Sequence, residues 1–246
     1  MSASSQSDRI TEDLRDDILR GRYRAGDRLP SERELANRFQ VQRAPVREAL
    51  KKLEQLGLAD IKPGGVRVCA LQTASLDVVE HLLALSDPPD PEIVQMVIEV
   101  HSALILLAAR LGTQRGTDAQ IERCLELLEE FGHPEVDQAH EHGSILELSD
   151  LLVEASGNLV LSLAHRGIRL QFLENLKGRE ELLHLPATTR VPMAEALAQA
   201  LRNRDGKTLS DLLSELATQV GENAVSIIRS QIEPGTQTQS TGTRSS

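Results

Sequence analysis

The sequence has almost no aromatic residues: they make up 2% of its 246 residues, with one Tyr, three Phe and no Trp. Stacking platforms for single-stranded nucleic acid depend on aromatic rings, so we do not expect one here. Cysteine is equally scarce, because the chain holds only Cys69 and Cys124. Two distant cysteines exclude a disulfide framework and a cysteine-rich zinc site, and they favour a reducing, cytoplasmic location.

Long apolar runs are also missing. The most apolar stretch, residues 98–111, contains Glu99, His101 and Arg110 and is shorter than the roughly 20 residues that a membrane span needs. The first residues, MSASSQSDR, are polar and lack the apolar core of a secretory signal. We therefore expect no membrane partner.

Charge is divided unevenly along the chain. The net charge is −10, but residues 8–70 hold 14 Lys and Arg against 11 Asp and Glu, whereas residues 71–246 hold 13 against 26. With 40% hydrophobic and 26% charged residues, the composition is that of a globular protein. The division predicts a small, mildly basic N-terminal unit followed by a larger acidic one.

Helical patterns dominate the N-terminal unit. Apolar residues recur at helical spacing over residues 10–19, which predicts a first helix. Ser31 and Glu34 have the spacing of a capping box and predict a short second helix. A third helix is expected over about residues 43–56, because Pro45 is tolerated in a first turn and apolar residues follow at helical spacing.

A β-hairpin is predicted after these helices. Residues 58–62 and 66–70 are β-prone and flank the turn Pro63-Gly64-Gly65. Helix, helix, short turn, helix and hairpin in this order are typical of a winged helix-turn-helix. In that motif the second helix of the pair enters the major groove of DNA.

Arginines stand where such a motif would meet DNA. Arg43 and Arg47 begin the third helix and, four residues apart, share one of its faces. Arg33 lies on the first turn of the preceding helix, from which it can reach a phosphate or a guanine. An Arg pair alone is most often a solvated face, but the complete order of elements favours DNA binding.

The stretch AGDRLPSERELANRFQVQRAPVREALKKLEQLGL resembles the DNA-binding domain of the GntR family of bacterial repressors, and the resemblance covers residues 9–68. It implies a DNA-binding domain over residues 1–70, with double-stranded DNA as its partner. Carried over position by position, it implies DNA contacts from the arginines and from the wing. The expected DNA-binding residues are Arg33, Gln42, Arg43, Ala44, Pro45, Arg47, Gly64 and Gly65.

Two of these positions depart from the family pattern. Gln42 stands where the family usually has Ser or Thr, and it is a poorer N-cap. Ala44 stands where Thr is frequent; it lacks a hydroxyl for a phosphate, but its methyl can meet a thymine methyl. These departures bear on the operator sequence rather than on DNA binding itself.

The acidic remainder is predicted to be helical throughout. A linker with a short helix is expected over residues 71–91, ending at the proline-rich break DPPDP. Six helices follow, at about 92–112, 117–131, 137–156, 158–178, 188–204 and 207–231. The polar tail, residues 233–246, is expected to be disordered. The fold class is therefore mainly α, with a winged helix-turn-helix and a C-terminal antiparallel helical bundle.

This helical domain, residues 92–232, is similar to that of the FadR-like subfamily, whose C-terminal domain is of the FCD type. The stretches LSDLLVEASGNLVLSLAH and LAQALRNRDGKTLSDLLSEL carry the likeness. The resemblance implies an antiparallel bundle that binds a small effector and forms a homodimer.

Many members of that subfamily hold a divalent metal with one Asp and three His. Counting from Asn158 and from Asp205 places the four ligand positions at Ile145, Ser149, Ala194 and Leu216. None of these ligates a metal in the usual way. We therefore predict that the family's metal is absent and that no other cofactor is bound.

The expected effector pocket comprises His101, Ile145, Ser149, Ala194 and Leu216. A carboxylate buried without a cation is costly, so we expect a small, apolar or weakly polar effector, oriented by Ser149 and a nearby His or Arg. The alternative is a pocket filled by side chains. Histidines such as His101 and His165 are more often core residues than ligands, although either could line a pocket.

Together these features predict a ligand-responsive repressor that binds a palindromic operator as a homodimer, with effector binding in the helical domain altering DNA affinity. The alternative is a DNA-binding regulator whose helical domain only dimerises. An enzyme is not expected, because the sequence has no phosphate-binding glycine loop, no G-x-S-x-G motif and no Cys with a His partner.

Overall fold

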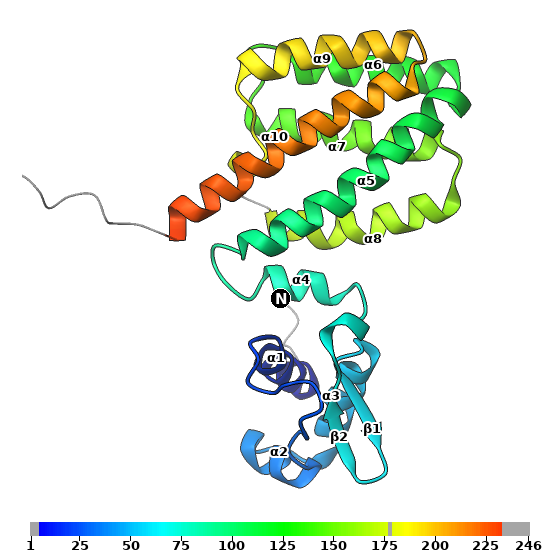
Figure 1. Cartoon of the computed structure of the whole chain (residues 1–246). Helices are drawn as coiled ribbons and strands as arrows, with labels where there is room; N and C mark the ends of the chain where they lie inside the picture. The colour runs from blue at the N-terminus through cyan, green and yellow to red at the C-terminus, as the bar shows by residue number, and fades with distance from the viewer. Residues whose placement is uncertain (1–4, 177–178, 233–246) are drawn as a thin grey trace, which may run out of the picture. The chain divides into compact units, whose positions relative to one another are not determined.

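A computed structural model describes residues 5–176 and 179–232 (Figure 1). The chain forms two compact units, one up to Asp87 and one from Pro88, which we call the head and the bundle. The predicted fold class is confirmed: helices dominate, and the small sheet lies in the head. The predicted disordered tail and the end of the predicted helix 158–178 lie outside the described residues.

Three helices build the head around one apolar core. They are α1 (Gln6–Leu19), α2 (Glu32–Phe39) and α3 (Arg43–Gln55). Both α1 and α2 pack against α3, and Leu14 and Val46 are fully buried between them. The predicted capping box is present, because the Ser31 hydroxyl accepts from the Glu34 amide while the Ser31 amide donates to the Glu34 carboxylate.

The predicted hairpin is confirmed with slightly shorter strands. It consists of β1 (Ala59–Lys62) and β2 (Gly65–Val68), which pair antiparallel with Lys62 opposite Gly65. The chain before α2 runs along the other edge of β2, where the Leu29 amide donates to the Val66 carbonyl at 3.0 Å. The wing is therefore held on both sides, and its turn is presented outward.

The segment expected as a linker packs on the head. After a short 3₁₀ turn, Leu71–Thr73, the chain forms α4 (Val78–Leu83). Val78 is 2% exposed and belongs to the apolar core of the head. The Ser75 amide donates to the Leu56 carbonyl at 2.9 Å, which ties the segment to the end of α3. Residues up to Asp87 are therefore part of the DNA-binding unit.

Six α-helices form the described part of the bundle, as the sequence pattern predicts. They are α5 (Pro91–Arg115), α6 (Asp118–Gly132), α7 (Gln138–Ala155), α8 (Leu159–Leu176), α9 (Ala187–Arg202) and α10 (Gly206–Ile232). A 3₁₀ turn, Glu180–Leu182, stands between α8 and α9. The helices α5 and α10 pair along their length, and α6 packs between α7 and α9 (Figure 1).

Helix α5 is long and apolar enough to cross a membrane, by length and composition alone. In the bundle it packs against α7, α8 and α10, and Ala108 and Ala109 are fully buried. A core helix of a helical bundle has apolar residues on its buried face, so packing explains part of this pattern.

Candidate DNA interface and effector pocket

The helix-turn-helix is closed by a tight turn. Gln40 has a left-handed conformation, with φ 53°, and the Val41 amide donates to the Ala36 carbonyl at 3.0 Å, which ends α2. Gln42 is the N-cap of α3, and its side chain makes no capping hydrogen bond. The sequence-based expectation of a weak cap at this position is therefore confirmed.

The first turns of α2 and α3 present cationic side chains to solvent. Arg33, Arg43 and Arg47 are exposed, as are Gln42 and Ala44. Pro45 is half-buried and Val46 is fully buried, so α3 turns its other face into the core. The helix thus has the two-sided character that a groove-reading helix needs.

These arginines differ in their partners. The Arg47 Nε donates to the Glu32 carboxylate at 2.7 Å, so that side chain is already paired. Within the described part of the chain, Arg33 and Arg43 make no ion pair. Their charges are available to a phosphate or a base edge.

The wing adds a further cation. Gly64 and Gly65 have φ of +111° and +130°, a conformation that side chains rarely adopt. A Cβ on Gly65 would lie 2.7 Å from Arg28 Nε, so the guanidinium rests against the glycine. Arg28 is exposed and was not among the residues expected at the DNA. In the sequence, the position of Arg28 two residues before Pro30 is the signal that could have identified it. In the structure, Arg28 lies opposite Arg67 of β2.

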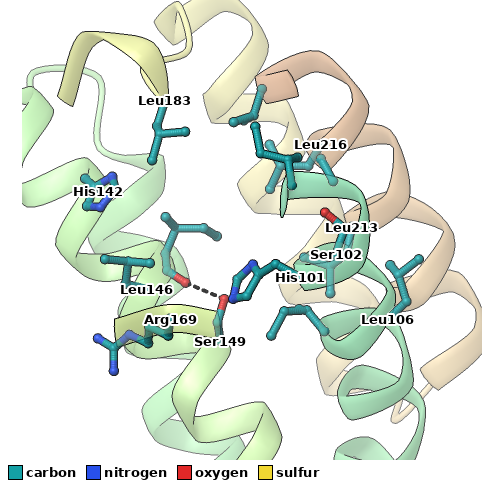
Figure 2. A pocket seen from close by; sticks show the side chains of 15 residues that line it. His101, Ser102, Leu106, His142, Leu146, Ser149, Arg169, Leu183, Leu213 and Leu216 are labelled. Atoms are coloured by element: carbon teal, nitrogen blue, oxygen red, sulfur yellow. Dashed lines mark hydrogen bonds between the residues drawn. The ribbon is translucent and has the colours of Figure 1, made fainter. Parts of the chain in front are cut away.

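The bundle contains a cavity of about 130 Å³. Four of the five expected pocket residues line it, namely His101, Ile145, Ser149 and Leu216. The lining residues come from α5, α7, α8, α10 and the segment before α9, which contributes Leu183. Figure 2 shows His101 beside Ser149, with Leu183 and Leu216 farther along the wall.

Ala194, the fifth expected pocket residue, does not line this cavity. None of the described residues that line the cavity belongs to α9, and Ala194 is 4% exposed within the core. A Cβ added to Gly132 of α6 would come within 2.8 Å of the Ala194 Cβ. The glycine lets α9 approach α6 closely, so this face of α9 packs on α6 and not on the pocket.

A chain of polar groups lies behind His101. The rings of His101 and His165 stack at 5.2 Å between centroids, and His165 Nε2 lies 2.8 Å from an Asp150 oxygen. The second Asp150 oxygen accepts from Arg169. Burial, with the nearby His165 and Arg169, lowers the pKa of His101 to about 4. His101 is therefore neutral at neutral pH.

A second polar group lies in the interior at the segment before α9. Glu141 is 3% exposed; its carboxylate accepts from the Leu185 amide at 3.0 Å and lies 2.6 Å from His184 Nδ1. Arg190 is 1% exposed and donates to the carbonyls of Phe131 and His133. These bonds hold the segment that carries Leu183 against the cavity.

Known proteins resemble this chain in both units. Residues 6–68 match the model of the family described as bacterial regulatory proteins, gntR family. The transcriptional regulator LutR of Bacillus subtilis is 31% identical over 170 residues, 67% of this chain and 74% of the relative. The repressor NanR of Klebsiella aerogenes is 30% identical over 207 residues, 81% and 77% of the two chains.

The chain belongs to the gntR family. It is accordingly a DNA-binding transcriptional regulator and not an enzyme, as predicted. The match to NanR extends well into the bundle, in agreement with the predicted FadR-like resemblance. The solved structure of Lar, described as controlling the Listeria monocytogenes agr system, covers 92% of this chain and all of its own. With 14% identity and a TM-score of 0.56, it supports the fold alone.

The metal that many FadR-like members hold does not fit this pocket. Three of the four ligand positions line the cavity, and they carry the side chains of Ile145, Ser149 and Leu216. In residues 5–176 and 179–232 there is no group of three or more His, Cys, Asp and Glu that could hold a metal ion. The absence of a bound metal stays a prediction.

Proposed function

We propose that this protein is a cytoplasmic repressor that binds a palindromic operator as a homodimer and releases it when a small effector enters the bundle. The observation that carries the proposal is the exposed cationic face of α2 and α3, where Arg33 and Arg43 have no ion pair with any residue that the structure describes. Repression is supported by the name of the relative NanR.

Operator reading depends on the first turn of α3. Side chains there reach base edges when the helix lies in the major groove. Arg43 has no ion-pair partner in residues 5–176 and 179–232, whereas Arg47 must first exchange Glu32 for DNA. The remaining cations, including Arg28 on the wing, are placed for phosphates, so binding falls steeply with salt.

Dimerisation is supported by exposed apolar stripes on two neighbouring helices. Met96, Val100 and Leu107 follow helical spacing on α5 and are about half exposed. On α8, Leu159, Leu163 and Leu170 have the same spacing and are 59% to 71% exposed. The helices α5 and α8 pack together, and exposed apolar surface of this kind marks subunit interfaces. A two-fold dimer would then match a palindrome.

Effector control follows from population shift. A ligand alters DNA affinity only by binding the operator-competent and operator-incompetent forms of the dimer with different strength. The cavity between α5, α7 and α10 supports this proposal because it offers space for such a ligand. In this proposal the ligand acts by shifting the population of the dimer and does not contact DNA itself.

Operator binding is tested with the full chain. Duplexes selected from a random library give the operator, and affinities of the wild type, Arg43→Ala and Arg47→Ala are then measured at one salt concentration. A base-reading arginine contributes about 1–3 kcal/mol, which corresponds to roughly 5- to 150-fold in affinity. Arg123→Ala in the bundle is the control. Unchanged affinity of both head variants would overturn the proposal.

The dimer is tested by sedimentation equilibrium. Val100→Glu with Leu163→Glu places charge in both apolar stripes and should convert the dimer to a monomer at micromolar concentration. Ala139→Glu, at an exposed position of α7, should leave the dimer intact. A wild-type protein that sediments as a monomer and binds DNA as one would contradict the dimeric mode.

A further inference from the structure

The pocket has the walls of an apolar ligand site. Of its lining residues ten are aliphatic, from Ile98 to Val220. The polar ones are His101, Ser102, His142, Ser149 and Arg169. Ligand sites of small molecules have this composition, with a few polar groups that fix orientation. What those groups can recognise depends on their charge and on the bonds that they already make.

Arg169, the cation among the described lining residues, forms an ion pair inside the protein. Arg169 donates to the Asp150 carboxylate, which also holds His165. In Figure 2 the Arg169 guanidinium points away from His101 and Ser149. An anionic ligand would therefore meet the pair of Arg169 and Asp150 together and would gain little net attraction.

Two polar groups that face the cavity, His101 and Ser149, are neutral. The His101 imidazole is uncharged at neutral pH, because burial lowers its pKa to about 4. The Ser149 hydroxyl donates to the Ile145 carbonyl at 2.9 Å, so its oxygen is left as an acceptor. A carboxylate, which only accepts, makes a poor partner for that oxygen, whereas a ligand with an N–H or O–H makes a good one.

The size of the cavity limits the ligand. A cavity of about 150 Å³ in another protein is known to take up benzene, with six heavy atoms. The 130 Å³ found here therefore suits a molecule of about five or six heavy atoms. That is small for an effector, so each hydrogen bond counts for more of its affinity.

From these observations we infer that the pocket binds a small, uncharged, mostly apolar molecule that donates a hydrogen bond to Ser149, and that it rejects carboxylates. The inference rests on the proposed effector role of the bundle. It departs from the metal-holding pocket that the subfamily resemblance implies, because three ligand positions carry Ile145, Ser149 and Leu216.

A matched pair of probes tests the ligand class. Isobutyramide and isobutyrate have six heavy atoms each and the same shape, and they differ in charge and in the N–H donor. Ligand-observed NMR on the full chain at pH 7.5 should give a dissociation constant at least tenfold lower for the amide. Equal binding, or tighter binding of isobutyrate, would overturn the inference. So would isobutyrate binding that appears on addition of Zn²⁺ or Ni²⁺.

Variants locate the binding. Ser149→Ala should weaken isobutyramide binding several-fold, and Ala217→Val should weaken it further by filling the cavity. Ala139→Val, on the exposed side of α7, is the control. Circular dichroism checks that each variant is folded. Two independent pocket variants are used so that the test still holds if one of them does not fold. Amide binding that survives both would place the site elsewhere and refute the inference.

A separate measurement distinguishes this inference from the proposed function. Operator affinity is measured with and without saturating isobutyramide. If the amide binds at Ser149 and operator affinity is unchanged, the ligand class stands and the effector role of this probe fails. If a carboxylate releases the operator instead, the effector role stands and the inference on ligand class fails.

Discussion

The exposed face of α2 and α3 in the head and the interior of the bundle use charge in opposite ways. In the head the arginines of α2, α3 and the wing are on the surface, and Arg33 and Arg43 have no ion pair among the described residues. In the bundle the charged groups Glu141 and Arg190 are almost fully buried and have partners on neighbouring elements. An exposed, unpaired charge serves an external partner, whereas a buried, paired one fixes internal geometry.

The two units also differ in how they fill their interiors. In the head, α1, α2, α3 and the hairpin close on one core that includes Val78 of the segment once expected as a linker. In the bundle, the helices leave a cavity of about 130 Å³ beside a well-packed core. A rigid unit suits the reading of DNA, and a unit with spare volume suits the uptake of a ligand.

The largest effect should come from the buried charge of the bundle. Arg190→Met leaves the Phe131 and His133 carbonyls unpaired and removes the cation 3.7 Å from Glu141. Breaking one side of a buried pair typically costs about 3–5 kcal/mol of unfolding free energy. Urea unfolding followed by circular dichroism measures it.

Lys207→Ala is the control for that experiment. Lys207 and Asp211 form an exposed pair at 2.6 Å on α10, and exposed pairs contribute little to stability because water screens them. A loss below 1 kcal/mol for Arg190→Met would show that the buried network is replaceable and would weaken the contrast between the units.

A glycine of the head should come next. Gly57 has φ +70°, and a Cβ there would lie 2.9 Å from the Thr73 carbonyl oxygen, which is backbone and cannot move aside. Gly57→Ala should therefore cost about 2–3 kcal/mol, from both the left-handed conformation and the clash. Tyr23 is the one Tyr of the chain and packs on the head core, so its fluorescence reports the unfolding of the head.

Gly21 supplies the matched comparison. Its φ is +74°, and nothing lies within 4 Å of the Cβ position. Gly21→Ala should therefore cost only about 1 kcal/mol, from the conformation alone. Equal losses at the two glycines would mean that residues 73–75 are not firmly packed on the head.

The pH dependence of the bundle gives the third test. The pKa of His101 is about 4 in the folded protein against 6.5 in an unfolded chain, so below pH 6.5 the unfolded state binds the proton first. Stability should fall as the pH drops from 6.5 to 4, by about 2–3 kcal/mol from this residue.

His101→Gln isolates that contribution. The variant cannot take up the proton, so its urea midpoint should decline less than that of the wild type over the same pH range. The surrounding groups, His165, Asp150 and Arg169, are unchanged in both proteins. Parallel decline of wild type and variant would show that His101 is not the group responsible.

Most of the fold could be predicted because it depends on local patterns. Three local signals each involve residues that are close together in the sequence. They are the capping box of Ser31 and Glu34, the apolar spacing of α1 and the glycines of the wing. The six helices of the bundle follow from the same periodicity. For the same reason the helix within residues 71–91 was predicted, but its packing on the head was not.

The polar interior could not be predicted in this way. Asp150 meets His165, 15 positions away, and Glu141 meets His184, 43 positions away. No local pattern marks such partners, because they depend on which helix faces come together. Ala194 shows the same limit: its position on α9 follows from the family likeness, but the close approach of α9 to α6 at Gly132 turns it away from the pocket.

The smallest effect concerns the cap of α3. Gln42 has the extended conformation of an N-cap but makes no side-chain capping bond. A Ser or Thr cap usually contributes about 1 kcal/mol of stability, because its hydroxyl oxygen accepts a hydrogen bond from the second or third amide of the helix. Here the third residue is Pro45, which has no amide hydrogen, so Gln42→Thr can use only the Ala44 amide.

We therefore expect Gln42→Thr to raise the stability of the head by only about 0.5 kcal/mol, measured by Tyr23 fluorescence in urea. In a Pro45→Ala background the third amide becomes available, and the same substitution should then contribute about 1 kcal/mol. The difference between the two backgrounds is the coupling of the cap to the proline. If the gain in stability is the same in both backgrounds, the missing amide of Pro45 does not explain why Gln is tolerated at position 42. A contact between Gln42 and DNA would then be the better explanation.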